Sequence, residues 1–600
     1  MSASLKSRAS ASALVMGQES AAAATRPRIA LGVMGQAGSP DAMRRLGDAL
    51  SHLKTLKIEP LLQKSVAALK AEDPKTAADW ALKALQQDER CGMAWYCLAI
   101  AREKAGDFKT SIQCYESALL LEPDHIEIAS NLGRLAARMG MSEVAEKLYK
   151  HYLAACPGAL EASNNLSCCL RDQHRYGEAI EVLRPVILAN PDNPLLWNTL
   201  GTVLTDQGEF EQALGFFDEA LRLDPDFVKA RYNRSTAKLH TDDPDAALID
   251  CEEALRGHMA EHERAMMNLA RSTMLVARGE LTEGWTAYEA RLSPHYPEAT
   301  HFVIDRPRWT PQDDLDGKTL LVVGEQGLGD EVLFANVIPD VIDALGPDGR
   351  LVLAVEKRLI PLFQRAYPQA EIIAHATYDV DAKTVRVTPA VGDMARIDLW
   401  TPMASLLVRF RPTVASFPDR RTFLAADPER VAHWKTVLEQ APPGPKIGIL
   451  WKSLKLEGAR LRYFSPFEAW RPVLTVPGAV FVNLQYGDCA AEIAEAKAQL
   501  GVKLWSPPGI DLKQDLDDVA ALCCALDLVL GPANATSNIA AACGAPTWLI
   551  STPGAWPKLG TDRYPWYPSM RVFTPPGANR WDAVMDEVAA AVGQGVAAGF

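Results

Sequence analysis

A glycine-rich turn followed by two carboxylates lies near the middle of the chain, in the segment TLLVVGEQGLGDEVLF. Residues 319–323 have the character of a strand, and the apolar run 320–323 within them predicts a strand buried on both faces, as in a parallel sheet. Gly327 and Gly329 leave room for a ligand beside the backbone, and Asp330 and Glu331 stand where a helix should begin. A carboxylate at this point can take a proton from a substrate hydroxyl, or it can simply cap the helix.

A second strand, loop and helix appear near the C-terminus, in the segment LVLGPANATSNIAAACGAPTWLI. The N–H groups and dipole at the start of such a helix favour an anion such as a phosphate. The candidate phosphate ligands are Asn534, Thr536, Ser537 and Asn538. The alternative is a helix start that is capped by its own side chains.

Two further segments carry groups suited to a nucleotide. The loop WKSLKLEGARLRYF is basic, and cations there would stabilise charge on a departing phosphate, although a solvated basic loop would have the same composition. The segment FVNLQYGD ends a predicted strand with a glutamine and a tyrosine that can contact a base or a sugar. The candidate donor contacts are Lys452, Arg460, Arg462, Gln485 and Tyr486.

An alternation of strands and helices from residue 318 onward would position these groups. The predicted strands are 319–323, 351–355, 371–374, 446–451, 479–484, 526–531 and 546–550. Such alternation predicts parallel sheets with helices on both faces. A proline-rich break at 441–445 divides them into two doubly wound halves, and a ligand is expected in the cleft outside the carboxyl ends of the strands.

The region before these strands contains a repeat of 34 residues, marked by Pro123, Pro157, Pro191 and Pro225. Small residues at fixed positions let two antiparallel helices approach, aromatic residues fill the gap beside them, and the proline ends the second helix. About six repeats are predicted between residues 56 and 292, stacked into a superhelix. Recurring polar residues are expected on its concave face, where they can bind an extended peptide backbone or bridge neighbouring helices. They are Asn131, Asn165, Thr199 and Asn233.

Composition excludes several classes of protein. The formal charge is −13 and no long run of Lys and Arg occurs, which argues against binding to nucleic acid or a membrane surface. The eleven cysteines form no Cys-x-x-Cys pairs and are expected to be buried and reduced, in the cytoplasm. No apolar stretch reaches the length of a membrane helix, and residues 1–50 are expected to be a disordered tail.

The repeat residues resemble the tetratricopeptide repeat, and the asparagine positions resemble the asparagine ladder of eukaryotic protein O-GlcNAc transferases. The junction with the α/β region resembles bacterial proteins that join such repeats to a glycosyltransferase domain, a resemblance that covers about residues 58 to 590. It is carried by Gly279, Leu281, Gly284, Trp285, Tyr288, Glu289, Arg291, Trp309, Leu315, Gly317 and the loop Glu-Gln-Gly-Leu-Gly-Asp. The implied fold is an α-solenoid followed by a GT-B fold with two Rossmann-like halves.

The resemblance also implies roles for individual residues. Asp330 matches the aspartate that acts as the base in heptosyltransferases with a similar Leu-Gly-Asp, with Glu331 and Glu325 as substitutes. The related pattern usually has an acidic residue before the donor loop and a histidine on its helix, whereas Gly531 and Asn538 occur here. No metal is expected, because GT-B enzymes usually work without one. The aromatic residues of RYPWYPSMRVF are expected to be core and hinge.

The segments RYFSPFEAWRPVL and FVNLQYGD are similar to bacterial flagellin glycosyltransferases, which transfer a nonulosonic acid such as pseudaminic acid from CMP to Ser or Thr. The sequence therefore predicts a protein O-glycosyltransferase with flagellin as acceptor and a nucleotide sugar as co-substrate. Two alternatives stay open: an O-GlcNAc-type enzyme that uses a UDP-sugar, and a non-catalytic adaptor or chaperone. The expected organisation is a tail (1–50), repeats (51–295), an acceptor half (296–440) and a donor half (441–600).

Overall fold

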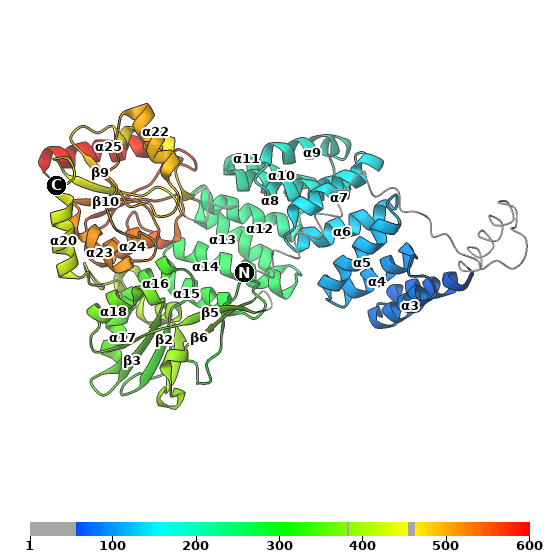
Figure 1. The fold of residues 1–600 in the computed structure, drawn as a ribbon, viewed down its shortest axis with the longest axis horizontal. Coiled ribbons are helices and arrows are strands. Elements are labelled where there is room, and N and C mark those ends of the chain that lie inside the picture. Colours follow the sequence, from blue (N-terminus) through cyan, green and yellow to red (C-terminus); the bar gives the residue numbers. More distant parts are fainter. Residues whose placement is uncertain (1–55, 381–382, 454–462, 600) are drawn as a thin grey trace, which may run out of the picture. The chain divides into compact units, whose positions relative to one another are not determined.

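The computed structural model describes residues 56–380, 383–453 and 463–599, and the chain divides into two compact units between Val203 and Leu204. The first unit is helical. After helical residues 56–70 it contains α3 (Pro74–Gln87), α4 (Gly92–Lys104), α5 (Phe108–Leu121), α6 (Ile126–Arg138), α7 (Ser142–Ala155), α8 (Leu160–Asp172), α9 (Tyr176–Ala189) and α10 (Pro194–Gln207), the last of which crosses the division (Figure 1).

The helix pairs of the repeats share one turn. A residue with left-handed backbone recurs at 34-residue intervals between the two helices of a pair, at Glu72, Gly106, Gly140, His174, Gly208 and Asp242. Small residues permit close packing within a pair: a Cβ atom added to Gly133 of α6 would lie 3.3 Å from the Tyr149 ring of α7. The predicted repeat architecture is therefore confirmed for the described residues.

The second unit begins with further repeat helices, α11 (Phe210–Leu223), α12 (Val228–His240), α13 (Pro244–Arg256), α14 (Glu261–Ala277) and α15 (Leu281–Tyr288). About six repeats were predicted, and α14 and α15 form one further pair, whose turn contains Gly279, also with left-handed backbone. This pair departs from the 34-residue spacing.

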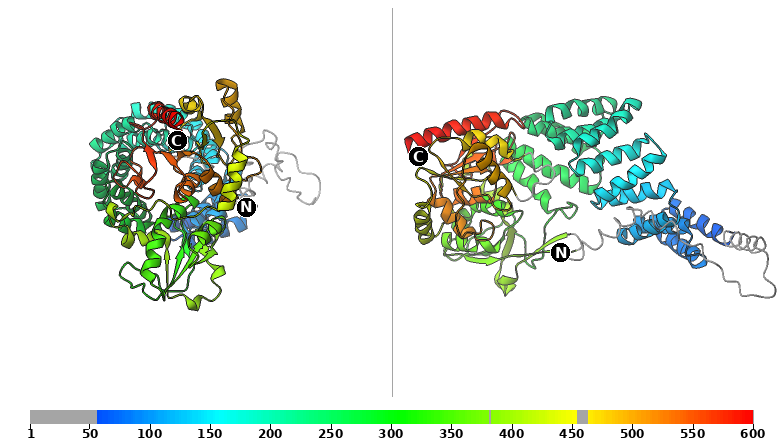
Figure 2. Two further views of the ribbon diagram at one scale, coloured as in Figure 1. Left: turned by 90° about the vertical axis from the view of Figure 1, so that its left-hand side faces the viewer. Right: turned by 45° about the horizontal axis from the view of Figure 1, so that its top comes forward.

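Two parallel sheets follow in the second unit (Figures 1 and 2). The first has the order β4-β3-β2-β7, with β2 (Thr319–Val323), β3 (Arg350–Val355), β4 (Glu371–Ala374) and β7 (Leu399–Pro402). The second has the order β12-β11-β10-β8-β9, with β8 (Lys446–Ile449), β9 (Val480–Asn483), β10 (Leu528–Pro532), β11 (Thr547–Ile550) and β12 (Arg571–Phe573). All seven predicted strands are present, whereas β7 and β12 were not predicted.

Helices cover both faces of the second sheet. Ile447 and Ile449 of β8 belong to a core that includes Trp581 and Val584, whereas Leu450 belongs to a core with Trp434. These helices are α20 (Pro428–Leu438), α21 (Arg471–Leu474), α22 (Ala490–Leu500), α23 (Leu516–Ala525), α24 (Ala535–Ala542) and α25 (Trp581–Ala598). Helix α20 precedes the proline-rich segment and nevertheless packs on α23.

The first sheet differs from the prediction on one face. Leu320 and Val322 face the core that includes α16 (Leu328–Phe334) and α17 (Ile338–Leu345), and α18 (Ile360–Ala366) contributes to the same core. Leu321 and Val323 instead pack against Phe302 and Met394, which do not lie on an α-helix. This face lacks covering helices among the described residues because the connection from β4 to β7 forms strands and 3-10 turns.

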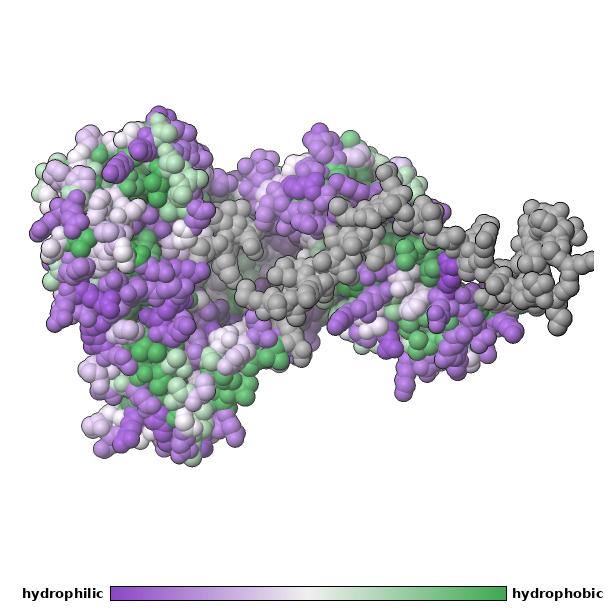
Figure 3. Space-filling view, in the orientation of Figure 1, coloured by the Kyte–Doolittle hydropathy of each residue, from purple (hydrophilic) through white to green (hydrophobic). Residues whose placement is uncertain are grey.

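A small third sheet has the order β1-β6-β5, with β1 (His301–Phe302), β5 (Ala376–Val380) and β6 (Lys383–Val387). No helix in the described part of the chain is long and apolar enough to cross a membrane. Figure 3 shows hydrophilic and hydrophobic residues interspersed on the visible face of the described residues.

Candidate functional site

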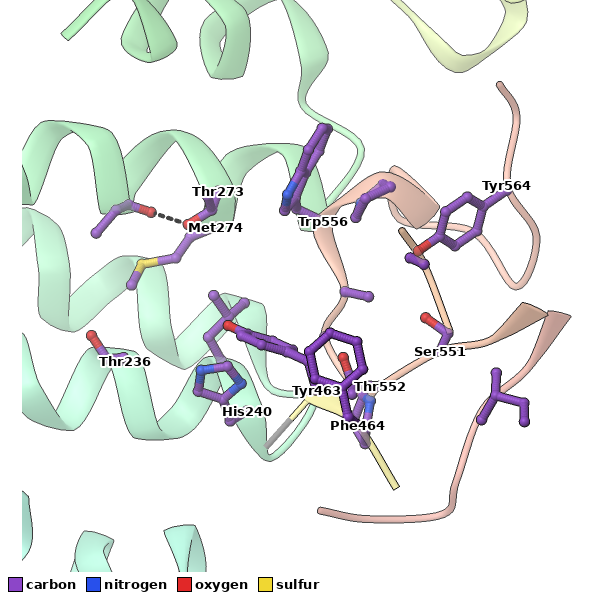
Figure 4. A pocket seen from close by; sticks show the side chains of 18 of the residues that line it. Thr236, His240, Thr273, Met274, Tyr463, Phe464, Ser551, Thr552, Trp556 and Tyr564 are labelled. Atoms are coloured by element: carbon purple, nitrogen blue, oxygen red, sulfur yellow. Dashed lines mark hydrogen bonds between the residues drawn. The ribbon is translucent and has the colours of Figure 1, made fainter. Parts of the chain in front are cut away.

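A cavity of about 530 Å³ lies at the carboxyl ends of three strands of the second sheet. Ser453, Ala533 and Ser551, which follow β8, β10 and β11, line one side of it. Thr236 of α12 and Thr273 of α14 line the other side, so the repeat helices form part of the wall (Figure 4). The volume is within the range of sites for small molecules, roughly 300–1,000 Å³.

Strand order explains why the cavity forms at this edge. Strand β8 lies between β9 and β10, so the chain continues from β8 toward one side of the sheet and later returns on the other. In open parallel sheets, the crevice for a ligand lies outside the carboxyl ends of the strands at such a reversal. The cavity includes residues that follow both β8 and β10.

The cavity combines aromatic surfaces with hydroxyl groups. Tyr463, Phe464, Trp556 and Tyr564 line it, together with the hydroxyls of Ser453, Thr552 and the residues already named (Figure 4). Burial raises the pKa of Tyr564 to about 12, so this phenol stays protonated at neutral pH. The Ser551 hydroxyl is buried beside the Tyr564 phenol, whose pKa it acts to lower, and within the described residues it forms no hydrogen bond of ordinary geometry. Such a group is costly to bury unless a ligand or water binds it.

His240 is the only basic side chain among the described residues that line the cavity, and no carboxylate lines it. Its ring stacks on Phe210 with a centroid separation of 4.7 Å and lies 6.2 Å from the ring of Tyr463. This wall therefore suits a ligand with ring faces and hydroxyl groups better than one that requires several cations.

The repeat side of the cavity is joined tightly to the loop after β11. A Cβ atom added to Gly554 would lie 2.2 Å from the Leu239 carbonyl oxygen, and the Gly554 N–H donates to Asp242 over 3.0 Å. Asn579 donates to the Gly208 carbonyl over 3.2 Å. The second sheet is therefore attached directly to the repeat helices of the same unit.

The structure brings the two predicted ligand loops together. Helices α16 and α24 pack against each other, and Asn538 Nδ2 donates to the Gly329 carbonyl oxygen over 3.0 Å. A Cβ atom at Gly329 would lie 3.3 Å from that nitrogen, so a side chain there would require Asn538 to shift slightly. Asn538 is thus already engaged with the opposite loop.

Asp330 lies in the first turn of α16 and is half-buried. Its Oδ2 atom accepts the Gly327 N–H over 3.1 Å, as expected for a residue that caps the helix start. Its negative charge contributes, after burial, to raising the pKa of Tyr288 and Tyr567. Asp330 does not line the cavity, but Phe334 of the same helix packs near Trp556, which does.

The other two carboxylates of this loop are buried and have partners. Glu331 binds His375 Nε2 over 2.9 Å and accepts the Glu356 N–H over 2.9 Å. Glu325 forms two bonds of 2.8 Å with Arg291 and accepts the Ala404 N–H over 2.8 Å. Both therefore hold the loop in place, and neither is poised to accept a proton from a substrate.

Most of the predicted donor contacts already have partners within the protein. Asn534 Oδ1 accepts the N–H groups of Thr536 and Ser537, and the Ser537 hydroxyl accepts the Asn534 N–H. Gln485 is buried and bridges β8 and β9 through the N–H groups of Trp451 and Lys452.

Of the other predicted donor contacts, the structure describes Lys452 and Tyr486. Lys452 pairs with Glu492. Burial raises the pKa of Tyr486, which is half-buried. Arg460 and Arg462 lie outside the described residues.

Two of the polar residues expected on the concave face, Asn131 and Thr199, bridge neighbouring repeats. Asn131 Nδ2 donates to the Tyr96 hydroxyl over 2.6 Å, and the Thr199 hydroxyl donates to Asn164 over 2.6 Å. Asn165 is half-buried in the first unit, and Asn233 is half-buried in the second. Bridging was the alternative interpretation of these positions, and it describes Asn131 and Thr199.

Sequence reasoning missed several cavity residues. His240 and Thr273 lie on repeat helices that were expected to bind only a protein, and Ser551 follows a strand whose loop contains no motif. Tyr564 and Trp566 belong to a segment expected to be core and hinge, and both lie in the core, but Tyr564 also lines the cavity. The loop residues among them could have been found from their position, because they follow the carboxyl ends of parallel strands.

A second missed group is His375, which follows β4. Its Nε2 atom contacts Glu331, and its buried Nδ1 atom has no hydrogen-bond partner. Within the described residues, no group of three or more His, Cys, Asp or Glu side chains is arranged to hold a metal ion.

Comparisons with known proteins place the chain. Tetratricopeptide repeat models match residues 96–159 and 170–239. The chain is 50% identical over 590 residues to the protein FlbA of Caulobacter vibrioides, covering 98% of this chain and 99% of that protein. It is 27% identical over 161 residues to the human protein O-mannosyl-transferase TMTC1, covering 26% of this chain and 18% of that protein. A solved tetratricopeptide repeat protein from Parabacteroides merdae is 16% identical, with a TM-score of 0.36, covering 39% of this chain and 91% of that one.

Proposed function

The chain belongs to the family of the Caulobacter vibrioides protein FlbA, and we propose that it is a glycosyltransferase that captures a protein on its repeats and transfers a sugar to it from a nucleotide. In this proposal the α/β region is a GT-B domain, with residues 296–440 as the acceptor half and 441–600 as the donor half. Residues 51–295 bind the acceptor protein, in keeping with the usual role of tetratricopeptide repeats.

The cavity carries this proposal. It lies at the reversal of strand order in a parallel sheet, where open α/β sheets bind nucleotides. Its aromatic rings can pack against a base or the C–H face of a sugar, and its hydroxyls can bind the polar edge of either. The start of α24 follows Ala533, which lines the cavity, so a phosphate near this edge would meet the positive end of the helix.

Asp330 is the proposed base. In the transfer, the acceptor hydroxyl oxygen bonds to the anomeric carbon, the bond from that carbon to the phosphate oxygen breaks, and the Asp330 carboxylate takes the hydroxyl proton. The nucleotide leaves with the electron pair of the broken bond. Asp330 suits this role better than Glu325 or Glu331, because those two carboxylates are fully buried, whereas Asp330 is half-buried.

The finer form of the proposal names the substrates. Resemblance to flagellin glycosyltransferases favours a nonulosonic acid, such as pseudaminic acid carried by CMP, and Ser or Thr of flagellin as the acceptor. A UDP-sugar is the alternative donor. Similarity to a protein O-mannosyl-transferase covers only 26% of the chain and supports no particular sugar.

The proposal is tested by the intact mass of flagellin that is co-expressed with this protein and a nonulosonic acid pathway. We expect a sugar-sized gain in mass with the wild type and none with Asp330→Ala. A gain that persists in Asp330→Ala would remove Asp330 as the base, and no gain with wild type would contradict transfer of this sugar.

A non-catalytic adaptor is the second candidate, and one observation favours it. Asn538, at the position where the related pattern has a histidine, bonds to the Gly329 carbonyl and so closes the contact between the two loops. If flagellin co-purifies with the protein, gains no mass, and the protein binds neither CMP nor UDP, the adaptor is the better account.

A further inference from the structure

The cavity has two walls of different origin. Loops after β8, β10 and β11 form one wall, and the helices α12 and α14 of the last repeats form the other (Figure 4). In a transferase that captures a protein on its repeats, the repeat helices would be expected only to bind the acceptor. Here they also contribute to the small-molecule cavity.

The repeat wall offers hydrogen-bond acceptors. The Thr273 hydroxyl donates to the Ala270 carbonyl over 2.7 Å, and the Thr236 hydroxyl lies 3.4 Å from the Tyr232 carbonyl. A threonine hydroxyl that donates its own proton within the helix keeps its oxygen lone pairs as acceptors. Both side chains are half-buried at the cavity. Thr273 is therefore set to accept from a ligand O–H, whereas Thr236, whose 3.4 Å contact is long for an O–H···O bond, is able to donate or accept.

The opposite wall suits a base, and it adjoins the start of α24, whose dipole favours a phosphate while Asn534 caps the N–H groups of Thr536 and Ser537. It includes the loop that leads into the start of α24, and the aromatic side chains Phe464 and Tyr564. A nucleotide held there would extend its sugar toward the helices, where hydroxyl groups meet the threonine oxygens. The buried Ser551 hydroxyl, which forms no hydrogen bond of ordinary geometry within the described residues, is a second group that can bind a ligand.

The repeat wall at α12 is held closely against the loop that follows β11. Gly554 lies against the Leu239 carbonyl with no room for a side chain, and its N–H donates to Asp242 in the turn between α12 and α13. A wall that is held this closely can discriminate between ligands by shape and hydrogen bonding.

From these observations we infer that the repeat helices α12 and α14 select the sugar, with Thr236 and Thr273 as specificity-determining residues that accept hydrogen bonds from its hydroxyl groups. This inference rests on the proposed transferase function and assigns the transferred sugar to the repeat side of the cavity. His240, on the same wall, contributes a further polar edge beside Tyr463.

The test compares a nucleotide sugar with its bare nucleotide. The affinities of the full-length protein for CMP, CMP-N-acetylneuraminic acid, UDP and UDP-N-acetylglucosamine are measured by calorimetry. The double variant Thr236→Val/Thr273→Val keeps the side-chain shape and removes both hydroxyls. For the nucleotide sugar that wild type binds, we expect affinity to fall about tenfold or more, because each lost hydrogen bond contributes about 1 kcal/mol. Affinity for the bare nucleotide should stay within about twofold.

Thr286→Val is the matched control. The Thr286 hydroxyl also donates to a carbonyl one turn back, that of Thr282, over 2.8 Å, but this residue does not line the cavity. The control should leave every affinity unchanged, and thermal unfolding of all variants should match wild type. Equal losses for sugar and bare nucleotide, or no loss at all, would overturn the inference while leaving the proposed function standing. Failure of wild type to bind any of the four probes would overturn both.

Discussion

The two parallel sheets of the second unit differ at the reversal of their strand order. In the first sheet β2 lies between β3 and β7, and the crevice beyond it is filled by the protein: Glu325 bonds to Arg291 and to the Ala404 N–H. In the second sheet the corresponding region opens into a cavity of about 530 Å³. A reversal of strand order is thus filled by the protein in the first sheet and open in the second.

The two crevices also differ in the charges that they contain. Burial disfavours the charge on Arg291, but Glu325 and Glu289 outweigh this effect and hold the pKa of the guanidinium above its ordinary value. The first crevice therefore contains a paired internal charge that links the last repeat to the sheet. The second is lined by aromatic rings and hydroxyls, one of which forms no hydrogen bond of ordinary geometry within the described residues. The paired charges occupy the first crevice, whereas the second crevice is open and can bind a ligand.

The largest expected effect comes from breaking the filled crevice. Arg291→Met leaves Glu325 buried without its cation, and the free energy of unfolding should fall by about 3–5 kcal/mol. Urea unfolding measures this change. The double variant Arg291→Met/Glu325→Met should recover most of the loss, because two apolar side chains leave no buried charge.

An exposed ion pair provides the control for this prediction. Asp245 pairs with Arg278, and its side chain is 74% exposed. Asp245→Asn should change the free energy of unfolding by at most about 1 kcal/mol. An equally small effect of Arg291→Met would contradict the assignment of a buried, structural pair.

The next effect concerns the wall of the open crevice. Gly554 has φ of 64°, and an added Cβ would meet the Leu239 carbonyl at 2.2 Å, whereas Gly509 has φ of 75° and no atom within 4 Å. Gly554→Ala and Gly509→Ala share the strain of left-handed backbone, about 1 kcal/mol. Gly554→Ala should cost about 1–3 kcal/mol more, because the loop must move from α12. Equal costs in denaturant unfolding would show that this loop does not depend on the repeat helices.

The smallest effect separates two serines of the second sheet. The Ser537 hydroxyl bonds to the Asn534 N–H and the Pro532 carbonyl at the start of α24, so Ser537→Ala should destabilise by about 1 kcal/mol. The buried Ser551 hydroxyl forms no hydrogen bond of ordinary geometry among the residues that the structure describes, so Ser551→Ala should leave stability unchanged or raise it slightly. Thermal unfolding of both variants checks the contrast, and a larger loss for Ser551→Ala would mean that its hydroxyl is bonded in the free protein.

Periodicity and turn residues in the sequence predicted the repeat helices and most of the buried strands, because both features depend directly on local structure. The 34-residue proline spacing predicted the repeats, and the strand predicted at 319–323 has the same bounds as β2. Strand β7 was missed because LWTP is short, ends in proline and follows irregular 3-10 turns. One face of the first sheet was wrongly expected to carry helices for the same reason.

The candidate site was harder to predict, since it depends on which residues the fold brings together. The contact between Asn538 and Gly329 joins positions 209 residues apart, and nothing in either loop indicates it. The cavity wall from α12 and α14 lies in repeats whose sequence pattern reports only on their own packing. Resemblance directed attention to loops with motifs, while several lining residues lie in segments without one.

Hydrogen–deuterium exchange with and without ligand tests the central claim most directly, namely that the open crevice of the second sheet binds the ligand. It is measured on the full-length protein with CMP-N-acetylneuraminic acid and, separately, with UDP-N-acetylglucosamine. The account predicts that one of them slows exchange in residues 550–557 and at the C-terminal end of α12, with no change in residues 319–325 around the filled crevice. Slower exchange confined to residues 319–325, or no change in either region with both ligands, would contradict it.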